Sequence, residues 1–248
     1  MSLKLGLNLT FNYSPNFDLP KRNYKKIKFI VIHYTGMKNE IRAIKRLCDS
    51  KSKVSSHYFI KNNGDVINLV PDLYVAWHAG KSFWKELTSL NNYSIGIEIN
   101  NPGHDNGYKK FTENQISSLL KLLKYLKKKY GIKKQNILGH SDISPDRKKD
   151  PGEKFPWVKL AKKNLCKWHN LDQKKIRNLR KLKLEDKEEK IFFKNLNFLG
   201  YFKGYTSSKS QQKRKKLIKA FQRKFRQNLI NGKLDKECFL ISKNLLKN

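Results

Sequence analysis

Residues 139–156 have the sequence Gly-His-Ser-Asp-Ile-Ser-Pro-Asp-Arg-Lys-Lys-Asp-Pro-Gly-Glu-Lys-Phe-Pro and follow a short apolar segment, residues 136–138, that we expect to be a strand. The prolines and Gly152 predict an ordered loop rather than a helix. The segment holds His140 and Asp150, with Lys148 between them. Imidazole and carboxylate groups both bind zinc, and a catalytic zinc usually has three protein ligands and a water. Two candidate ligands lie here, so the third must come from elsewhere.

Two apolar segments elsewhere in the chain predict buried strands that carry further polar side chains. Residues 27–34 are mostly β-branched or aromatic, and His33 lies near their end. Residues 94–100 alternate in polarity, with Glu98 inside the expected strand. We also expect strands over residues 55–60 and 66–70, and helices over residues 39–48, 112–130 and 157–168. This alternation predicts an α/β fold with a mixed central β-sheet flanked by helices.

The two histidines at strand ends have two interpretations. Side chains at the strand ends of a mixed sheet converge on a shared cleft, so His33, His140 and Asp150 could form one site. A single histidine after an apolar strand is more often a packed, hydrogen-bonded residue, and the spacing alone leaves both alternatives open. Glu98 would be a general base if its face borders the cleft, because burial raises a carboxyl pKa, and an ordinary surface glutamate otherwise. For Lys148, in so basic a chain, a solvated loop residue is the more common situation.

The chain divides by composition into four parts. Residues 1–26 form an N-terminal segment without regular structure, and residues 27–170 form the α/β domain. Residues 171–189 are charged and weakly periodic, which favours a linker. Residues 190–248 have their own apolar pattern, with a basic helix over residues 212–227, and predict a small all-α C-terminal domain.

Charge and cysteine content limit the classes of function. The net charge of +35 favours polyanionic partners such as nucleic acid, anionic lipid or an acidic cell-wall polymer, although a surface simply rich in lysine is an equal alternative. Cys48, Cys166 and Cys238 form no CxxC pair, so neither a disulfide framework nor a cysteine zinc site is expected. The chain shows no signal-peptide core and no apolar run near the roughly 18 residues of a membrane span, so we expect no transmembrane segment.

Five motifs together resemble the type 2 N-acetylmuramoyl-L-alanine amidases. They are Phe-Ile-Val-Ile-His33-Tyr-Thr, Val-Ser-Ser-His57-Tyr, Ala-Trp77-His78-Ala-Gly, Ser-Ile-Gly-Ile-Glu98 and Gly-His140-Ser-Asp-Ile-Ser-Pro-Asp-Arg147-Lys148-Lys-Asp150-Pro-Gly. The resemblance covers roughly residues 25–170 and is nearest to the members that prefer 1,6-anhydro-muropeptides. Residues 198–201, 220–226 and 231–235 resemble more loosely a peptidoglycan-binding domain 1 module. The alternative for this tail is a structural cap that only packs on the amidase domain.

The resemblance implies a role for each residue that matches a family position. His33, His140 and Asp150 would bind one Zn²⁺ per chain and leave one position for water, whose pKa zinc lowers. Glu98 would be the acid/base, and Lys148 would stabilise the oxyanion of the tetrahedral intermediate. The residues expected to line the substrate pocket or support it are His57, Trp77, His78 and Arg147.

The function implied is hydrolysis of the amide between N-acetylmuramic acid, or its 1,6-anhydro form, and L-alanine in peptidoglycan or muropeptides. The alternative is a non-catalytic peptidoglycan recognition protein on the same fold, but such relatives typically lack a zinc ligand. No motif of a nucleic-acid-binding module is present, so no specific nucleic acid partner is expected. The absence of a signal peptide favours the cytoplasm and the wall-binding tail favours the cell envelope, and the sequence leaves the oligomeric state open.

Overall fold

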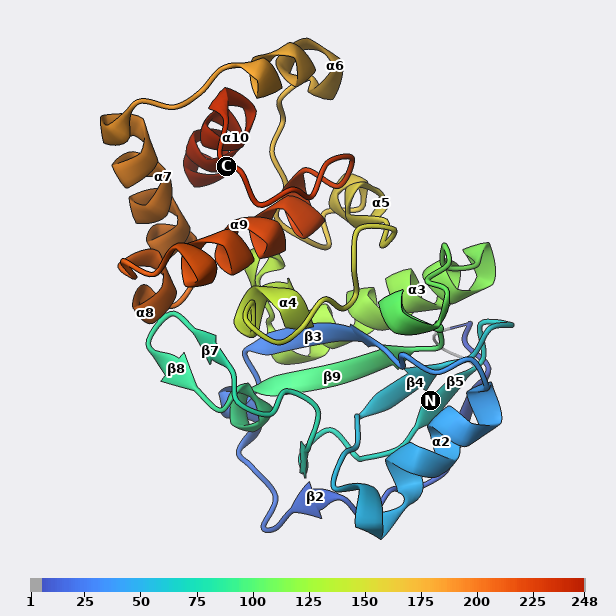
Figure 1. Ribbon diagram of the computed structural model, residues 1–248. Coiled ribbons are helices and arrows are strands. Elements are labelled where there is room, and N and C mark those ends of the chain that lie inside the picture. Colours follow the sequence, from blue (N-terminus) through green and yellow to red (C-terminus); the bar gives the residue numbers. More distant parts are fainter. Residues whose placement is uncertain (1–5, 248) are drawn as a thin grey trace.

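Figure 1 shows the computed structural model, which describes residues 6–247. A six-stranded mixed sheet has the order β1-β5-β4-β9-β3-β10, in which β4 and β5 are antiparallel and the other neighbours are parallel. Two small antiparallel pairs, β2 with β6 and β7 with β8, lie outside it. The strands are β1 (Leu9–Phe11), β2 (Phe17–Asp18), β3 (Phe29–Tyr34), β4 (Tyr58–Ile60), β5 (Val66–Asn68), β6 (Val75–Ala76), β7 (Phe83–Trp84), β8 (Leu87–Thr88), β9 (Ser94–Ile99) and β10 (Ile137–Gly139).

The helices follow the expected caps and apolar periodicity. Thr112 and Gln115 form a capping box at the start of α3, and Gly131 ends that helix with a left-handed backbone, φ 62°. The helices are α2 (Glu40–Cys48), α3 (Glu113–Tyr130), α4 (His140–Ile143), α5 (Trp157–Lys162), α6 (Gln173–Ile176), α7 (Asp186–Leu199), α8 (Lys203–Thr206), α9 (Gln211–Phe225) and α10 (Lys236–Lys247). None of these helices within residues 6–247 is both long enough and apolar enough to cross a lipid bilayer.

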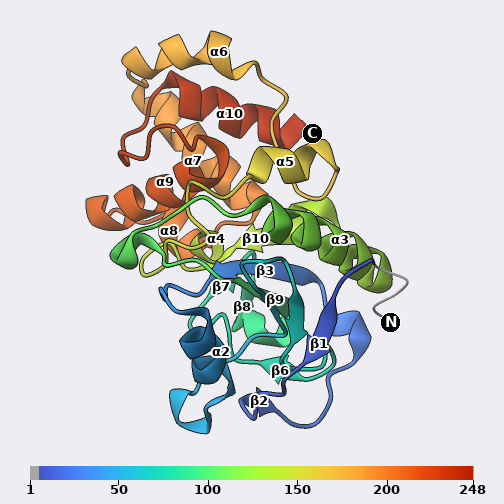
Figure 2. The same cartoon turned by 90° about the vertical axis from the view of Figure 1, so that its right-hand side faces the viewer.

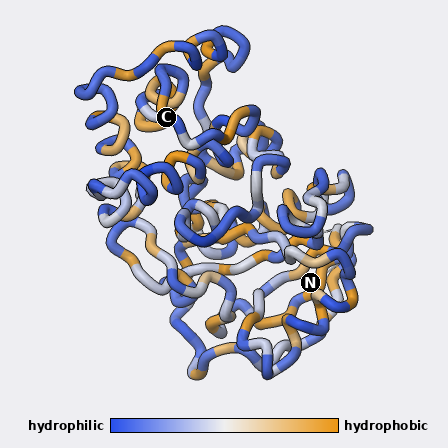
Figure 3. Tube along the Cα trace, in the orientation of Figure 1, coloured by the Kyte–Doolittle hydropathy of each residue, from blue (hydrophilic) through white to orange (hydrophobic). Residues whose placement is uncertain are grey.

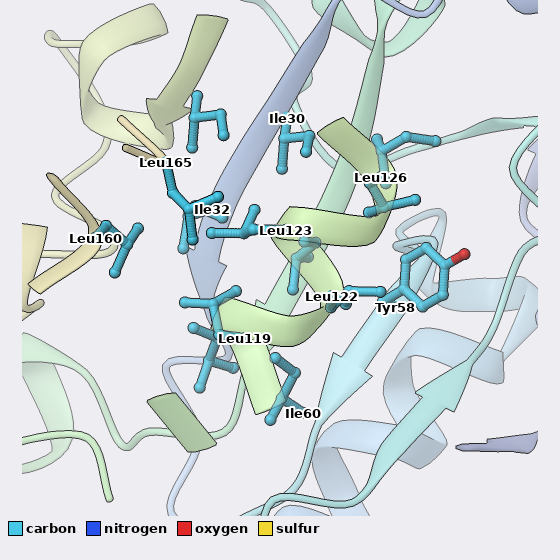
Figure 4. Close-up of a cluster of buried hydrophobic side chains, with 14 of the residues drawn as sticks. Ile30, Ile32, Tyr58, Ile60, Leu119, Leu122, Leu123, Leu126, Leu160 and Leu165 are labelled. Carbon is cyan, nitrogen blue, oxygen red and sulfur yellow. The ribbon is translucent and has the colours of Figure 1, made fainter. Parts of the chain in front are cut away.

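The sheet is covered on both faces, and the alternation of side chains along β3 determines which residues meet each cover. Ile30 and Ile32 point toward α3 and pack with its leucines, as Figure 4 shows. Phe29 and Val31 point to the opposite face, and α2 covers part of that face around Phe59. His33 has the same parity as Phe29 and Val31, so it lies on the face opposite α3.

The C-terminal helices pack directly against the strands that lead to the predicted site. One continuous cluster of buried apolar side chains includes Val31 and Leu138 of the sheet together with Phe192 of α7 and Phe221 of α9. Figure 2 shows α9 next to α4, with α7 and α10 gathered beyond α9. Hydrophobic residues alternate with hydrophilic ones along these helices in Figure 3, as expected for helices with one buried face. The mixed sheet, its flanking helices and the C-terminal helical region confirm the predicted fold class.

Two segments differ from the sequence-based predictions because of contacts distant in the chain. Residues 139–156 are not a loop throughout, since α4 begins at His140; its four residues contain no proline, and the Asp142 carboxylate accepts a hydrogen bond from the Gly139 amide (2.8 Å). The N-terminal segment is not wholly irregular, because β1 joins the edge of the sheet by pairing with β5. Residues 1–5 of that segment lie outside the described part of the chain.

The expected helix over residues 157–168 is shorter than its apolar pattern indicated. It ends at Lys162, and Asn164 has a left-handed backbone with φ 55°. Leu165 and Cys166 lie after the end of this helix and are buried in the apolar cluster beneath α3. They are apolar because they pack in that cluster, not because they continue the helix. Apolar spacing alone cannot distinguish a residue in the buried face of a helix from a buried residue in the segment after it.

Candidate metal centre

Three parallel strands bring the predicted site residues together. The register of β3 and β9 pairs His33 with Glu98, and the register of β3 and β10 pairs Ile32 with Gly139, so His140 follows beside His33. The carboxyl ends of parallel strands meet at one edge of a sheet, where α/β proteins commonly bind ligands. A cavity of about 470 Å³ opens there, and its lining includes His33, Glu98, His140 and Asp150.

One atom from each of three buried side chains forms a small triangle at this cavity. The Nδ1 atoms of His33 and His140 are 2.9 Å apart, and Asp150 Oδ2 lies 3.1 Å from the first and 3.0 Å from the second. Among the described residues these three are the group of histidine, cysteine and acidic side chains arranged to hold a metal ion. Tetrahedral zinc with bonds of about 2.0–2.2 Å places its ligand atoms roughly 3.3–3.5 Å apart, close to these separations.

The tautomer of His140 follows from its outer hydrogen bond. Its Nε2 lies 3.0 Å from the backbone carbonyl of Ala79, which can only accept, so the imidazole proton is on Nε2. The Nδ1 atom therefore presents a lone pair to the triangle. An outer carbonyl that fixes the ring in this way is the usual companion of a metal-binding histidine.

The tautomer of His33 is fixed by a longer relay. The Ser94 hydroxyl donates to the Leu90 carbonyl (2.6 Å) and so accepts from Nε2 of His78 (3.2 Å). His78 Nδ1 is then an acceptor for the Nε2–H of His33 (3.0 Å), which leaves a lone pair on His33 Nδ1. Two imidazole lone pairs and a carboxylate oxygen thus converge on one point, an arrangement that a cation would stabilise.

The pKa shifts agree with a neutral imidazole at His33 and an ionised carboxylate at Asp150. Burial, together with the neighbouring His140, lowers the pKa of His33 to about 4. Burial alone would raise the pKa of Asp150, but the two imidazoles hold it far below its usual range. Neutral imidazole and ionised carboxylate are the forms that bind metals.

Glu98 lies at the cavity without a hydrogen-bond partner for one carboxylate oxygen. Its Oε2 is shielded from solvent and has no partner among the described residues. Burial and the charge of Asp150 raise the pKa of Glu98 to about 8, although the nearby Lys148 lowers it. An orphaned buried carboxylate oxygen beside a cleft is unusual and indicates a group held for a ligand or a reaction.

The other predicted site residues separate into two sets. Lys148 and Trp77 line the cavity, and so does Arg147, whose guanidinium donates to the carbonyls of Ala79 (2.5 Å) and Lys81 (2.9 Å). His78 lines it too, but its ring nitrogens are occupied by the relay behind His33. His57 does not line the cavity: it is fully buried, and its Nδ1 accepts from the Gly96 amide (3.0 Å).

Several residues that support the site have no signal in the sequence-based argument. Ser94 completes the relay behind His33, and Asp142 holds the start of α4. Tyr201, between α7 and α8, and Lys224 of α9 both contact Asp142. The serine alternates with Glu98 on one face of β9, which could have placed it near the site. The contacts of Tyr201 and Lys224 with Asp142 cross more than fifty residues of chain and leave no local pattern.

The fold and this cluster define an α/β protein with a buried two-histidine, one-carboxylate site that could hold a metal ion, beside Glu98, whose Oε2 has no partner among the described residues. The chain belongs to the N-acetylmuramoyl-L-alanine amidase family, whose sequence model matches residues 23–153. This confirms the family that the five motifs indicated.

Known relatives support the same assignment. The N-acetylmuramoyl-L-alanine amidase AmiD of Escherichia coli is 34% identical over 236 residues, which are 90% of this chain and 84% of AmiD. Its structure, solved with the substrate anhydro-N-acetylmuramic acid-L-Ala-D-gamma-Glu-L-Lys, matches with a TM-score of 0.78 over 93% of this chain and 92% of that one. AmpDh3 of Pseudomonas aeruginosa matches with a TM-score of 0.78 at 28% identity, over 94% of this chain and 96% of that one. The structural matches to AmiD and to AmpDh3 both extend beyond residue 153, so the C-terminal helices belong to the fold that the three proteins share.

Proposed function

We propose that this protein is a zinc-dependent amidase that cleaves the amide between N-acetylmuramic acid, or its 1,6-anhydro form, and L-alanine in peptidoglycan fragments. The observation that carries the proposal is the triangle of His33, His140 and Asp150 at a cavity that also holds Glu98. The substrate seen with AmiD contains this bond. Cell-wall turnover or recycling is the process that such a reaction serves.

Zinc held by the three ligands would lower the pKa of a water molecule and polarise the scissile carbonyl. Beside a divalent cation, the Glu98 carboxylate is favoured in its ionised form, which is the form that a base requires. Glu98 would accept a proton from the attacking water and return it to the alanine nitrogen as the C–N bond breaks. Lys148, which lines the same cavity, would stabilise negative charge on the carbonyl oxygen.

Metal analysis tests the proposal. The purified protein should contain about one zinc per chain, and chelation should abolish the release of L-alanyl peptide from a purified muropeptide. Adding zinc back should restore release, because the three ligands remain in place. Bound zinc without cleavage would favour a recognition protein on the same fold, and the absence of both zinc and cleavage would refute the proposal.

We further propose that residues 190–248 act as a peptidoglycan-binding domain beyond a linker at residues 171–189, with residues 27–170 as the catalytic domain. A groove of about 530 Å³ between α7, α8 and α9 supports a binding role. Lys190, Lys194 and Lys203 line it around Phe193. Cations around an aromatic ring suit the carboxylates and sugar rings of peptidoglycan.

Charge removal tests this binding role. The triple variant Lys190→Ala, Lys194→Ala, Lys203→Ala should sediment less with insoluble peptidoglycan and retain turnover of a small muropeptide, because no residue of the groove lines the cavity at the ligand triangle. A matched variant, Lys110→Ala with Lys124→Ala and Lys128→Ala, removes the same charge from exposed positions around α3. Equal loss of sedimentation in both variants would mean that net charge, rather than the groove, binds the polymer.

A further inference from the structure

We propose that Tyr201, between α7 and α8, and Lys224 of α9 are positioning residues for the metal ligand His140, acting through Asp142. The inference rests on the proposed metal-dependent function and adds that the C-terminal helices complete the metal site. It is carried by a buried network that joins α9 and the segment before α8 to the one-turn helix α4. Neither Tyr201 nor Lys224 lines the cavity.

Asp142 is the centre of the network. Its side chain is buried, with 2% of the residue exposed, and its carboxylate accepts three hydrogen bonds. Oδ2 accepts from the Gly139 amide (2.8 Å) and from Lys224 Nζ (2.8 Å), while Oδ1 accepts from the Tyr201 hydroxyl (2.9 Å). One donor therefore comes from the residue immediately before His140, and the other two come from α9 and from the segment between α7 and α8.

Lys224 contacts the chain on both sides of His140. Besides Asp142, its ammonium group donates to the carbonyl of Ile137 in β10 (3.2 Å), and it lies 4.6 Å from the ring centre of Trp157. Only 4% of Lys224 is exposed. A buried ammonium group with its charge and donors committed in this way is costly to move, so it holds β10 and α4 in one arrangement.

Helix α4 cannot maintain its own position. It is a single turn of four residues, far below the length at which a helix is stable alone. At its start the chain is tightly enclosed, since a side-chain carbon on Gly139 would lie 2.7 Å from Pro151 Cδ. The orientation of His140 toward the triangle therefore depends on the groups that hold Asp142 and the backbone around it.

A second contact links the C-terminal helices to the other side of His140. The Lys85 amide donates to the Gly200 carbonyl (2.6 Å), and Phe83 stacks on Phe202 at 4.5 Å between ring centres. Phe83 and Lys85 belong to the β7–β8 hairpin. This hairpin follows Ala79, whose carbonyl accepts a hydrogen bond from His140. The hairpin that follows Ala79 and the Asp142 carboxylate thus lie on two sides of His140, and both contact the segment around Tyr201.

The network assigns the C-terminal helices a role that differs from binding polymer. A module tethered only for affinity would contribute to sedimentation with peptidoglycan and leave zinc binding unaffected. Here Lys224 of α9 forms an ion pair with the buried carboxylate of Asp142, which lies in the same helical turn as the candidate ligand His140. Loss of that lysine should therefore weaken zinc binding as well as lower folding stability.

The test compares two buried cations in the full-length chain. Lys224→Met removes the charge at Asp142, whereas Arg226→Met removes a cation that contacts Asp235 and Glu237, within the C-terminal helices. Zinc affinity is measured by competition with a chromophoric chelator at a temperature where circular dichroism shows each variant folded. We expect about tenfold weaker zinc binding and a lower kcat at unchanged KM for Lys224→Met, similar to loss of a partner behind a metal ligand. For Arg226→Met we expect a lower Tm with the wild-type zinc affinity.

Tyr201→Phe provides a milder variant if Lys224→Met does not fold. It removes one hydroxyl from Asp142 and should shift zinc affinity in the same direction by less. Zinc affinities equal to wild type in Lys224→Met, or in Tyr201→Phe if only that variant folds, would overturn the positioning role while leaving the amidase proposal intact. A wild-type protein that binds no zinc would instead remove the proposed function and this inference with it.

Discussion

Glu98→Gln should keep one zinc per chain and lower muropeptide turnover by roughly 10²–10⁴-fold, the usual contribution of a positioned general acid/base. Glutamine has almost the same shape as glutamate but cannot accept the proton from water. Because Oε2 of Glu98 has no partner among the described residues, the change breaks no hydrogen bond at that oxygen. Stability should therefore be retained, and burial of a neutral amide in place of a carboxyl with a raised pKa should even favour folding.

The measurements are zinc content, Tm and single-turnover cleavage of one defined muropeptide. Glu86→Gln provides the control, because it makes the same chemical change at an exposed residue of the β7–β8 hairpin that does not line the cavity. Near-wild-type turnover in Glu98→Gln would exclude Glu98 as the base. Loss of zinc in that variant would instead mean that the carboxylate supports the metal site rather than the proton transfer.

The elements that the sequence predicted best are those whose signal is local. Strand β3 is a run of residues that packs on both faces of the sheet, and α3 carries its own capping box and its own terminating glycine. His33 and Glu98 could be placed near one another because each lies near the end of an apolar strand. Periodicity also placed α9 within two residues of its ends.

The elements that the sequence did not predict depend on distant partners. Strand β1 has three residues and exists because β5 offers it an edge. Helix α4 exists because Asp142 caps its start and because Lys224, more than eighty residues later, balances the carboxylate. A proline-rich segment predicts a loop only where such distant contacts are absent. No periodicity within residues 139–156 indicates that these contacts exist.

The candidate site also has features that the sequence predicted and features that depend on distant contacts. The ligand types and the order of the motifs could be recognised from the sequence, whereas the tautomers that direct both Nδ1 atoms inward depend on the Ala79 carbonyl and the relay through His78 to Ser94. His78 was expected at the pocket, and its ring also supports His33 from behind. His57 carried an equally prominent motif, but it is fully buried and its Nδ1 accepts a hydrogen bond from the Gly96 amide of β9. Its place could not be deduced from the sequence, because the parity of a short strand is not fixed by its neighbours.

His140→Ala should lose zinc and amidase activity together. The substitution removes one of the three atoms of the triangle, so affinity should fall by more than the roughly 10–100-fold that loss of an outer partner costs. Zinc raises the Tm of a protein that binds it in the folded state, by an amount that grows with the ratio of zinc concentration to Kd. Wild type should therefore show a zinc-dependent rise in Tm, and His140→Ala should show none at the same zinc concentration.

His104→Ala is the matched control for that experiment, because it also removes a histidine. His104 Nε2 lies 3.0 Å from Glu153, outside the triangle, and its loss leaves all three candidate ligands in place. The zinc-dependent rise in Tm should therefore persist in His104→Ala. If His140→Ala still bound one zinc with wild-type affinity, the ion would have to lie elsewhere, because two remaining atoms at 3.1 Å cannot reproduce a three-ligand site. The lone pairs that converge on this point would then require another explanation.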